Sequence, residues 1–258
     1  MREISGIVTA IERASVHDGA GFRTTVFFKG CPLKCVWCHN PECIRFEPQV
    51  LHYPEKCIGC GMCDKGCFAG AKVLCGQSMT VEQIMEQIRQ DKPYYREKGG
   101  VTFSGGEALC QPDVLMELVK QCKAEGINTA IETSLFIYHE EILKSLDFVM
   151  ADFKIWDDEK HIKYTGVSNS AIKENFKKLD ELSVPFLVRT PLIPGITDNS
   201  ENITNIREFV KDFKHVQGYE LLDYNPLGET KSIALGYEPV KFETKALTVK
   251  ELKKYADI

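Results

Sequence analysis

The 258-residue sequence has no apolar segment approaching the roughly 20 residues that are needed to cross a bilayer. It also has no N-terminal run that joins a basic flank, an apolar stretch and a small-residue cleavage site. We therefore expect a cytoplasmic protein with no membrane partner.

Long basic blocks, low-complexity tracts and long internal repeats are absent as well. The 32 Lys and Arg residues are mixed with 37 Asp and Glu residues, which gives a net charge of -5. This balance argues against nucleic acid as the main partner and favours a protein or a small molecule. The hydrophobic content of 43% is sufficient for a large folded core.

Cysteine, in contrast, is abundant and clustered. The chain has 11 cysteines, an odd number, and disulfides are rare in the reducing cytosol, so ligation is the better explanation. Seven fall into two clusters, 31/35/38 and 57/60/63/67. Of the others, we assign Cys43, Cys110 and Cys122 to packing, because free cysteine is often a small buried hydrophobe.

Short β-rich runs alternate with amphipathic helical stretches outside residues 44–78, a pattern that is typical of βα units around a parallel sheet. Strands are predicted at 23–29, 100–103, 127–132, 147–153, 185–190 and 217–222. A capping box at Thr80 and Gln83 and a proline at 112 predict two helix starts. Further helices are predicted at 138–145, 169–182, 200–213 and 247–256.

The fold class that follows is α/β, a partial (β/α)6 TIM-like barrel formed by residues 1–43 and 79–258. Residues 44–78 replace periodic apolar positions with Pro, Gly and Cys, which indicates a small insert. In parallel α/β barrels the chemistry collects at the carboxyl ends of the strands. The loops after the six predicted strands contain most of the unusual residues of the chain, so we expect the active site at that rim.

The first cysteine cluster, in "FFKGCPLKCVWCHNPEC", has the spacing C-x3-C-x2-C. Three buried free thiols or a zinc site are alternatives, but structural zinc usually takes four ligands from two paired knuckles, and no second pair lies nearby. Three thiolates can hold three corners of an iron–sulfur cubane and leave one iron open for a reactant.

The segment "DGAGFRTTVFFKGCPLKCVWCHNPE", residues 18–42, resembles the radical S-adenosylmethionine (SAM) superfamily, and above all its glycyl radical enzyme activating branch. The resemblance implies a catalytic [4Fe–4S] cluster on Cys31, Cys35 and Cys38, whose fourth iron is chelated by SAM. It places Trp37 near the cluster and the adenine, with core packing as the alternative, and gives Asn40 a part in shaping the loop.

The same resemblance implies roles for residues after the later strands. The "SGGE" segment would receive the methionine ammonium group, although glycine pairs after strands are also common turns. Residues 152 and 154 match the family's Asp-x-Lys pair, in which the aspartate and a facing carboxylate on the third strand would hold a monovalent cation near the cofactor. Glu132 stands where that facing aspartate is expected. Arg189 and Asn225 would contact the cofactor or partner, with Asn225 where histidine is often found; both could instead cap the barrel. The cofactor-binding candidates are Trp37, Asn40, Ser104, Gly105, Gly106, Glu107, Glu132, Asp152, Lys154, Arg189 and Asn225.

Asp18 and Gly19 resemble a "DGPG" segment that lies near the substrate glycine in this family, with Ala20 in place of the proline. We expect these two residues to contact the substrate loop.

The second cluster, "CIGCGMCDKGC" at 57–67, is the C-x2-C-x2-C-x3-C run of bacterial ferredoxins, with Phe68 where proline is usual. In two-cluster ferredoxins the fourth cysteine ligates the other cluster, so two runs are needed, and this chain has one. Zinc or disulfide chemistry is the alternative. We expect a half-size ferredoxin-like insert with one auxiliary [4Fe–4S] cluster on Cys57, Cys60 and Cys63, completed by Cys67 or Cys75, with Cys75 favoured.

The resemblance thus implies an oxidoreductase, a radical SAM activase in an anaerobic cytoplasm. A flavodoxin or ferredoxin reductant would deliver an electron, SAM would be cleaved to a 5′-deoxyadenosyl radical, and that radical would remove hydrogen from a backbone glycine of a partner glycyl radical enzyme. A radical SAM enzyme acting on a small molecule or peptide is the nearer alternative. An iron–sulfur electron-transfer protein is the remoter one.

Overall fold

The structure is a computed structural model that describes residues 3–63, 66–242 and 245–257, and its largest element is one eight-stranded sheet. The strand order is β10-β9-β8-β7-β6-β2-β1-β5. The strands of this sheet are β1 (Ser5–Ser15), β2 (Arg23–Phe28), β5 (Gln77–Thr80), β6 (Gly100–Gly105), β7 (Asn128–Thr133), β8 (Phe148–Asp152), β9 (Phe186–Pro191) and β10 (Val216–Leu222).

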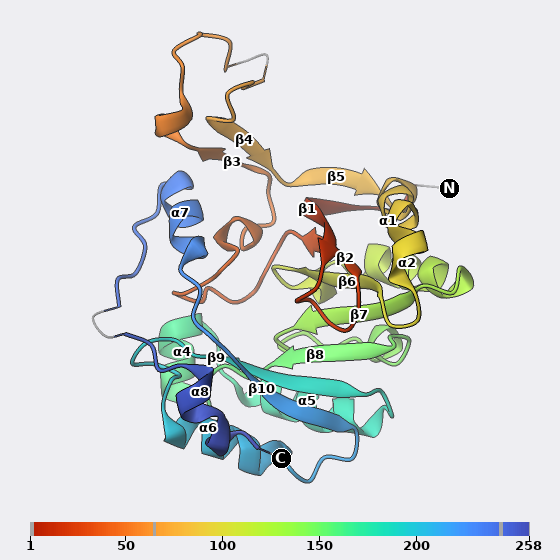
Figure 1. Ribbon diagram of the computed structural model, residues 1–258, viewed down its shortest axis with the longest axis vertical. Helices are drawn as coiled ribbons and strands as arrows, with labels where there is room; N and C mark the ends of the chain where they lie inside the picture. Colours follow the sequence, from red (N-terminus) through yellow and green to blue (C-terminus); the bar gives the residue numbers. More distant parts are fainter. Residues whose placement is uncertain (1–2, 64–65, 243–244, 258) are drawn as a thin grey trace.

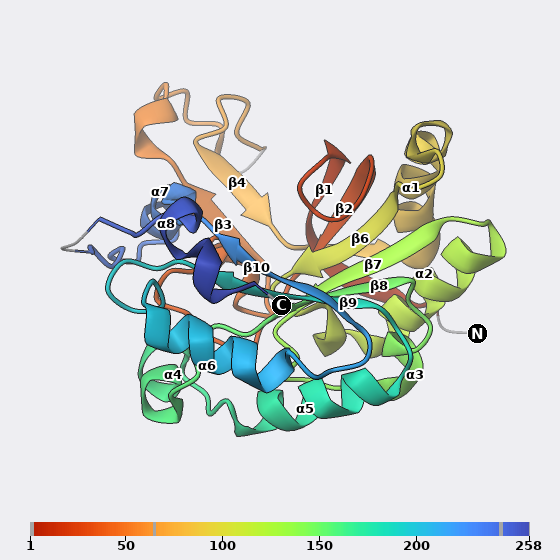
Figure 2. The same cartoon turned by 60° about the horizontal axis from the view of Figure 1, so that its bottom comes forward.

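Six of these strands, β2 and β6 to β10, pair in parallel and in chain order, which confirms the six strands predicted from the sequence. The strand order does not return from β10 to β2, so the parallel strands form an open partial barrel and not a closed ring. The predicted α/β class is therefore confirmed. Helices α3, α5 and α6 lie along one face of the sheet (Figure 2).

Helices follow the strands as the sequence pattern predicts. The capping box forms at Thr80, whose hydroxyl accepts from the Gln83 amide N–H at 3.2 Å while its own amide donates to Oε1 of Gln83 at 2.9 Å. Pro112 occupies the first turn of its helix. The helices are α1 (Val81–Tyr95), α2 (Pro112–Ala124), α3 (Glu140–Leu143), α4 (Asp158–Thr165), α5 (Ser170–Glu181), α6 (Ser200–Val210), α7 (Leu227–Ala234) and α8 (Val249–Leu252).

Four elements of this sheet and its helices differ from the sequence-based expectation. β1 and β5 extend the sheet in the antiparallel sense, and α4 and α7 are helices in segments where none was predicted. The helix predicted at 247–256 is only α8 followed by the short 3-10 turn η5 (Lys253–Tyr255). These additions matter because α4 and α7 both contact the cysteine loop described below.

The core lies between the sheet and the helices. The apolar faces of α1 and α2, including Ile84, Ile88, Leu115 and Leu118, are fully buried against the strands. This continuous packing makes the carboxyl ends of the parallel strands a rigid platform for the loops that follow them.

The insert forms its own two-stranded sheet from β3 (Gln49–His52) and β4 (Lys72–Cys75), outside the main sheet. It projects from the barrel near α7 (Figure 1). Two short 3-10 turns flank β3: η1 (Pro41–Cys43) lies before it and η2 (Pro54–Lys56) lies after it. Among the described residues, no helix is both long and apolar enough to cross a membrane.

Candidate functional site

The loop after β2 carries the cysteine triplet and is anchored on both sides by backbone hydrogen bonds. On one side, the Cys31 amide donates to the Ile44 carbonyl at 2.9 Å. On the other side, the Lys34 and Val36 amides donate to the carbonyls of Thr165 and Tyr164, at the end of α4, at 2.7 and 3.1 Å. The unpredicted helix α4 thus helps to fix the path of the loop.

Within this loop the three thiols are close enough to affect one another's ionisation. Burial raises the pKa of Cys38 to about 12, with a further contribution from Cys35. Burial also raises the pKa of Cys31, and the nearby Glu107 and Cys35 raise it further. The pKa of Cys35 is raised by burial as well. Iron binds thiolates, so loading of the loop would release protons.

The donor set of this loop fits a cubane with one open iron. The loop offers three thiols, and the nearby Cys43 is fully buried with its sulfur 3.2 Å from the Thr9 hydroxyl. Among the residues that the structure describes, no group of three His, Cys, Asp or Glu side chains converges on a single ion. A cubane is bound through three separate irons, so its thiolates need not converge in that way.

The "SGGE" loop after β6 packs directly on the cysteine loop. Gly106 donates to the Phe28 carbonyl at 2.9 Å, and the amide of Glu107 donates to the Gly30 carbonyl at 2.8 Å. A Cβ at Gly106 would lie 2.4 Å from the Gly30 carbonyl oxygen, and Gly105 has a φ of +112°. Both glycines are therefore required by close backbone approach.

The carboxylate of Glu107 is buried and already partnered within the protein. It accepts hydrogen bonds from the Thr133 hydroxyl at 2.9 Å and from the Ser134 amide and hydroxyl at 3.0 and 2.7 Å. Burial raises its pKa, against the opposing effect of these bonds. In this structure the side chain ties the loop after β6 to the loop after β7.

A network of charges centred on the buried Arg189 lies at the ends of β7, β8 and β9. Arg189 donates through Nη1 to Glu132 at 2.6 Å and through Nε to Asp152 at 3.0 Å. Lys154 donates to the second oxygen of Asp152 at 2.8 Å, and the Ser104 hydroxyl donates to Glu132 at 2.5 Å. Two carboxylates are thus balanced by two cations.

This network sets the ionisation of its members and borders the cysteine loop. Burial favours neutral Asp152, but Arg189 and Lys154 outweigh that effect and lower its pKa. The cationic Lys154 acts on the nearby Cys35 thiol in the sense that lowers its pKa. The guanidinium of Arg189 bridges the two carboxylates, Glu132 and Asp152, which the family resemblance implies as the site of a monovalent cation.

Asp18 and Gly19 precede β2, so they enter the partial barrel from the edge opposite to the cysteine loop. The carboxylate of Asp18 accepts from the Thr25 hydroxyl at 2.6 Å and its carbonyl accepts from Thr102. A Cβ at Gly19 would lie 3.5 Å from the methyl carbon of Met150, whose sulfur is 3.7 Å from Nη1 of Arg189. Met150 therefore connects this loop to the charge network.

Helix α7 contacts the cysteine loop at its last cysteine. A Cβ at Gly228 would lie 2.3 Å from the Cys38 carbonyl oxygen, so this glycine allows the contact. Lys231 donates to Asn40 at 2.8 Å and to Glu42 at 2.7 Å. Asn40 therefore helps to shape the loop, as expected, through a lysine that the sequence analysis missed.

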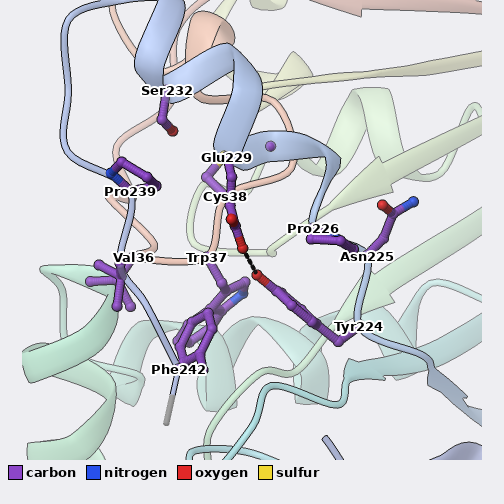
Figure 3. A pocket seen from close by; sticks show the side chains of 12 residues that line it. Val36, Trp37, Cys38, Tyr224, Asn225, Pro226, Glu229, Ser232, Pro239 and Phe242 are labelled. Carbon is purple, nitrogen blue, oxygen red and sulfur yellow. Dashed lines mark hydrogen bonds between the residues drawn. The ribbon is translucent and has the colours of Figure 1, made fainter. Parts of the chain in front are cut away.

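A small pocket lies where α7 meets this loop (Figure 3). Trp37 and Cys38 line it from the loop, and Asn225 lines it from the segment after β10. The side-chain oxygen of Asn225 accepts from the Leu227 amide at 3.0 Å at the start of α7. Glu229 in α7 accepts from the Tyr224 hydroxyl at 2.9 Å (Figure 3).

The contact with Cys38 becomes readable in the sequence only once helix α7 is known. Gly228 lies inside α7, where glycine costs about 1 kcal/mol relative to alanine. A helical glycine often marks close approach of another backbone, and here that backbone is Cys38.

The second cysteine cluster is distributed differently from the first. Cys57, Cys60 and Cys63 are exposed, Cys67 is partly exposed, and Cys75 is buried in β4. Backbone N–H groups, those of Lys72 and Ala71 among them, lower the pKa of the Cys67 thiol, whereas burial raises that of Cys75. The two candidate fourth ligands therefore differ: Cys67 is partly exposed with a lowered pKa, and Cys75 is buried with a raised pKa.

Comparison with known proteins gives a consistent result. The radical SAM superfamily profile matches residues 25–209. The chain is 36% identical over 277 residues to the indoleacetate decarboxylase activating enzyme of Tractidigestivibacter scatoligenes, across 91% of this chain and 88% of that protein. It is 36% identical over 261 residues to the trans-4-hydroxy-L-proline dehydratase activating enzyme of Clostridioides difficile, across 87% of this chain and 86% of that protein.

A solved structure supports the fold. SuiB of Streptococcus suis, bound to S-adenosylmethionine, aligns with a TM-score of 0.57 at 16% identity, over 87% of this chain and 43% of that chain. At this identity the similarity concerns the fold alone.

Proposed function

Because the chain belongs to the radical SAM superfamily, and within it to the glycyl radical enzyme activating branch, we propose that it is the activase of one partner glycyl radical enzyme. When bound, the cluster and SAM supply a one-electron cleavage that yields methionine and a 5′-deoxyadenosyl radical able to remove hydrogen from a backbone glycine. The products are 5′-deoxyadenosine and a glycyl radical in the partner.

The observation that carries this proposal is the loop of Cys31, Cys35 and Cys38, which is anchored on both sides and offers three thiols. These residues would hold three irons and leave the fourth for SAM. The glycine pair after β6 presses against the loop and keeps the two segments in register. Trp37 and Asn225 would limit the space beside the cluster, since both line the pocket next to Cys38.

The charge network would orient the polar end of SAM. The buried Arg189 and the partly exposed Lys154 place two cations at the ends of β8 and β9, beside the cysteine loop. The planar fork of Arg189 suits a carboxylate. A monovalent cation at Glu132 and Asp152 stays part of the proposal, and its binding would require Arg189 to release at least one of these carboxylates.

Further parts of the proposal concern supply of electrons and the insert. In this proposal, residues 44–78 form a half-size ferredoxin-like module that holds one auxiliary [4Fe–4S] cluster. Residues 1–43 and 79–258 form the radical SAM barrel. The reductant is a flavodoxin or a ferredoxin, and the compartment is an anaerobic cytoplasm. Asp18 and Gly19 are the proposed contacts of the partner's glycine loop.

The test is incubation of the reconstituted protein with a glycyl radical enzyme encoded beside it, under anaerobic conditions with SAM and a reductant. We expect an electron paramagnetic resonance (EPR) doublet on the partner, and no doublet when SAM is omitted. The matched control is the partner with its radical-loop glycine replaced by alanine, which gives no doublet. Release of 5′-deoxyadenosine without any partner radical would contradict activation and would favour a small-molecule or peptide substrate.

A further inference from the structure

The insert is a long loop whose two ends are joined by the β3–β4 hairpin. The pairs run from Gln49 opposite Cys75 to His52 opposite Lys72. One further hydrogen bond, from the Tyr53 amide to the Ala71 carbonyl at 2.7 Å, closes the mouth of the loop. Residues 54–63 and 66–70 therefore lie beyond this closing pair, at the outer end of the hairpin (Figure 1).

All four cysteines of the ferredoxin-like run lie inside this closed loop. Cys57 follows the closing residue Tyr53 by four positions, and Cys67 precedes its partner Ala71 by four positions. The first and last cysteines are therefore tethered at equal chain lengths from the same closing pair. Asp64 and Lys65, between them, lie outside the described residues.

Cys75 lies outside the loop, at the opposite end of the hairpin. It is three residues from Lys72 along β4, which corresponds to about 10 Å of strand directed toward the barrel. To reach a cluster on Cys57, Cys60 and Cys63, it would have to break the pairing of β4 with β3.

The side chain of Cys75 is also occupied where it is. It is 4% exposed and packs with Leu51 and Ala234 beneath the hairpin. Its sulfur lies 3.8 Å from the Glu42 carbonyl oxygen. A strand that slips by one residue exchanges its buried and exposed faces, so this position is firmly specified.

Cys67, in contrast, lies in a turn suited to a ligand. Gly66 and Gly70 on either side have φ values of +99° and +68°, and a Cβ at either would meet no atom within 4 Å. Cys67 is partly exposed, whereas Cys75 is buried.

We propose that the insert holds a complete [4Fe–4S] cluster within one loop, ligated by Cys57, Cys60, Cys63 and Cys67, and that Cys75 is a packing residue. This inference rests on the auxiliary cluster of the proposed function and reverses the preference for Cys75 taken from the sequence. It also differs from two-cluster ferredoxins, in which the fourth cysteine of such a run serves the other cluster.

The test counts the iron of the auxiliary cluster alone. In the full-length chain, Cys31, Cys35 and Cys38 are all replaced by alanine, and the protein is reconstituted and assayed for iron and sulfide. This parent is expected to hold about four irons per chain. Cys67→Ala in this background is expected to reduce the count to about three or fewer and to give the EPR signal of an oxidised [3Fe–4S] cluster.

The matched control is Cys75→Ala in the same background, which is expected to retain about four irons and the parent spectrum. Cys75→Val, which refills the buried space and favours a strand, is a second control against local misfolding. The assignment would be overturned if both Cys75 variants lost iron while Cys67→Ala kept the iron count of the parent. It would also be overturned if every variant held four irons, or if the parent held no iron.

The result is separable from the proposed function. Wild-type protein that still releases 5′-deoxyadenosine from SAM while the parent holds no iron would overturn only the auxiliary site. Wild-type protein that releases none would instead count against the activase itself.

Discussion

Cys35→Ala is expected to abolish SAM cleavage, with 5′-deoxyadenosine release reduced by more than about a hundredfold. Changes outside the ligand shell of a metal site already cost 10- to 100-fold, and this change removes a ligand. The charges of Lys154 and Asp152 act on the Cys35 thiol and shift its pKa in opposite senses. Total iron is expected to fall by up to about four per chain.

Cys122→Ala is the matched control for this prediction. Cys122 is buried in α2, with its sulfur 3.7 Å from the sulfur of Met85, away from both cysteine clusters. The replacement is expected to cost about 1 kcal/mol of unfolding free energy and to leave iron content and product release unchanged. Equal loss of product in both variants would show that Cys35 acts only through stability.

Arg189→Met is expected to lower the unfolding free energy of the iron-free protein by about 3 kcal/mol, because it leaves buried charge without its partner. Glu132 and Asp152 each have about a fifth of their side-chain surface exposed, and Arg189 has 8%. Without the guanidinium, only Lys154 remains to balance two carboxylates. The measurement is chemical denaturation near pH 7, together with SAM binding to the reconstituted protein, which is expected to be lost.

Arg207→Met supplies the comparison. Arg207 pairs at the surface with Glu208, which is 44% exposed, and such pairs contribute about 0–1 kcal/mol. We expect a change of less than about 0.5 kcal/mol and normal SAM binding. If the two variants are equally stable, the charge network at the ends of β7 to β9 does not stabilise the fold as described.

The parallel strands could be predicted from the sequence because each is a short β-rich run between helical patterns. In β6 five of the six residues are buried, and in β8 the three central residues are buried. The carboxyl ends of parallel strands share one edge, so the order of the loops placed the cysteine triplet, the glycine pair and the charged residues at one rim. The strand order of the sheet confirms the predicted succession of parallel strands.

Helix α7 could not be predicted, because its formation depends on tertiary contacts. It has a proline before its first residue and a glycine at its second, and Leu227 and Ile233 are both exposed, so it lacks an apolar stripe. Its position is set by Gly228 and Lys231 against the cysteine loop. These partners are almost 190 residues away in sequence, beyond the reach of any local pattern.

The arrangement of charges was also beyond the sequence. The sequence pattern predicted that four charged residues lie at strand ends, namely Glu132, Asp152, Lys154 and Arg189. It did not predict that the guanidinium of Arg189 bridges both carboxylates. That outcome depends on the length of each side chain and on the stagger of three strands. In the insert, the register of β3 and β4 distinguishes Cys67 from Cys75, and a list of cysteine spacings does not contain that register.

The most direct measurement of the central claim is the EPR spectrum of the anaerobically reduced protein before and after SAM is added. An iron left open by Cys31, Cys35 and Cys38 predicts that SAM changes the spectrum of that cluster, and that Cys35→Ala removes the change. A reduced cluster signal that SAM leaves unaltered would contradict the account.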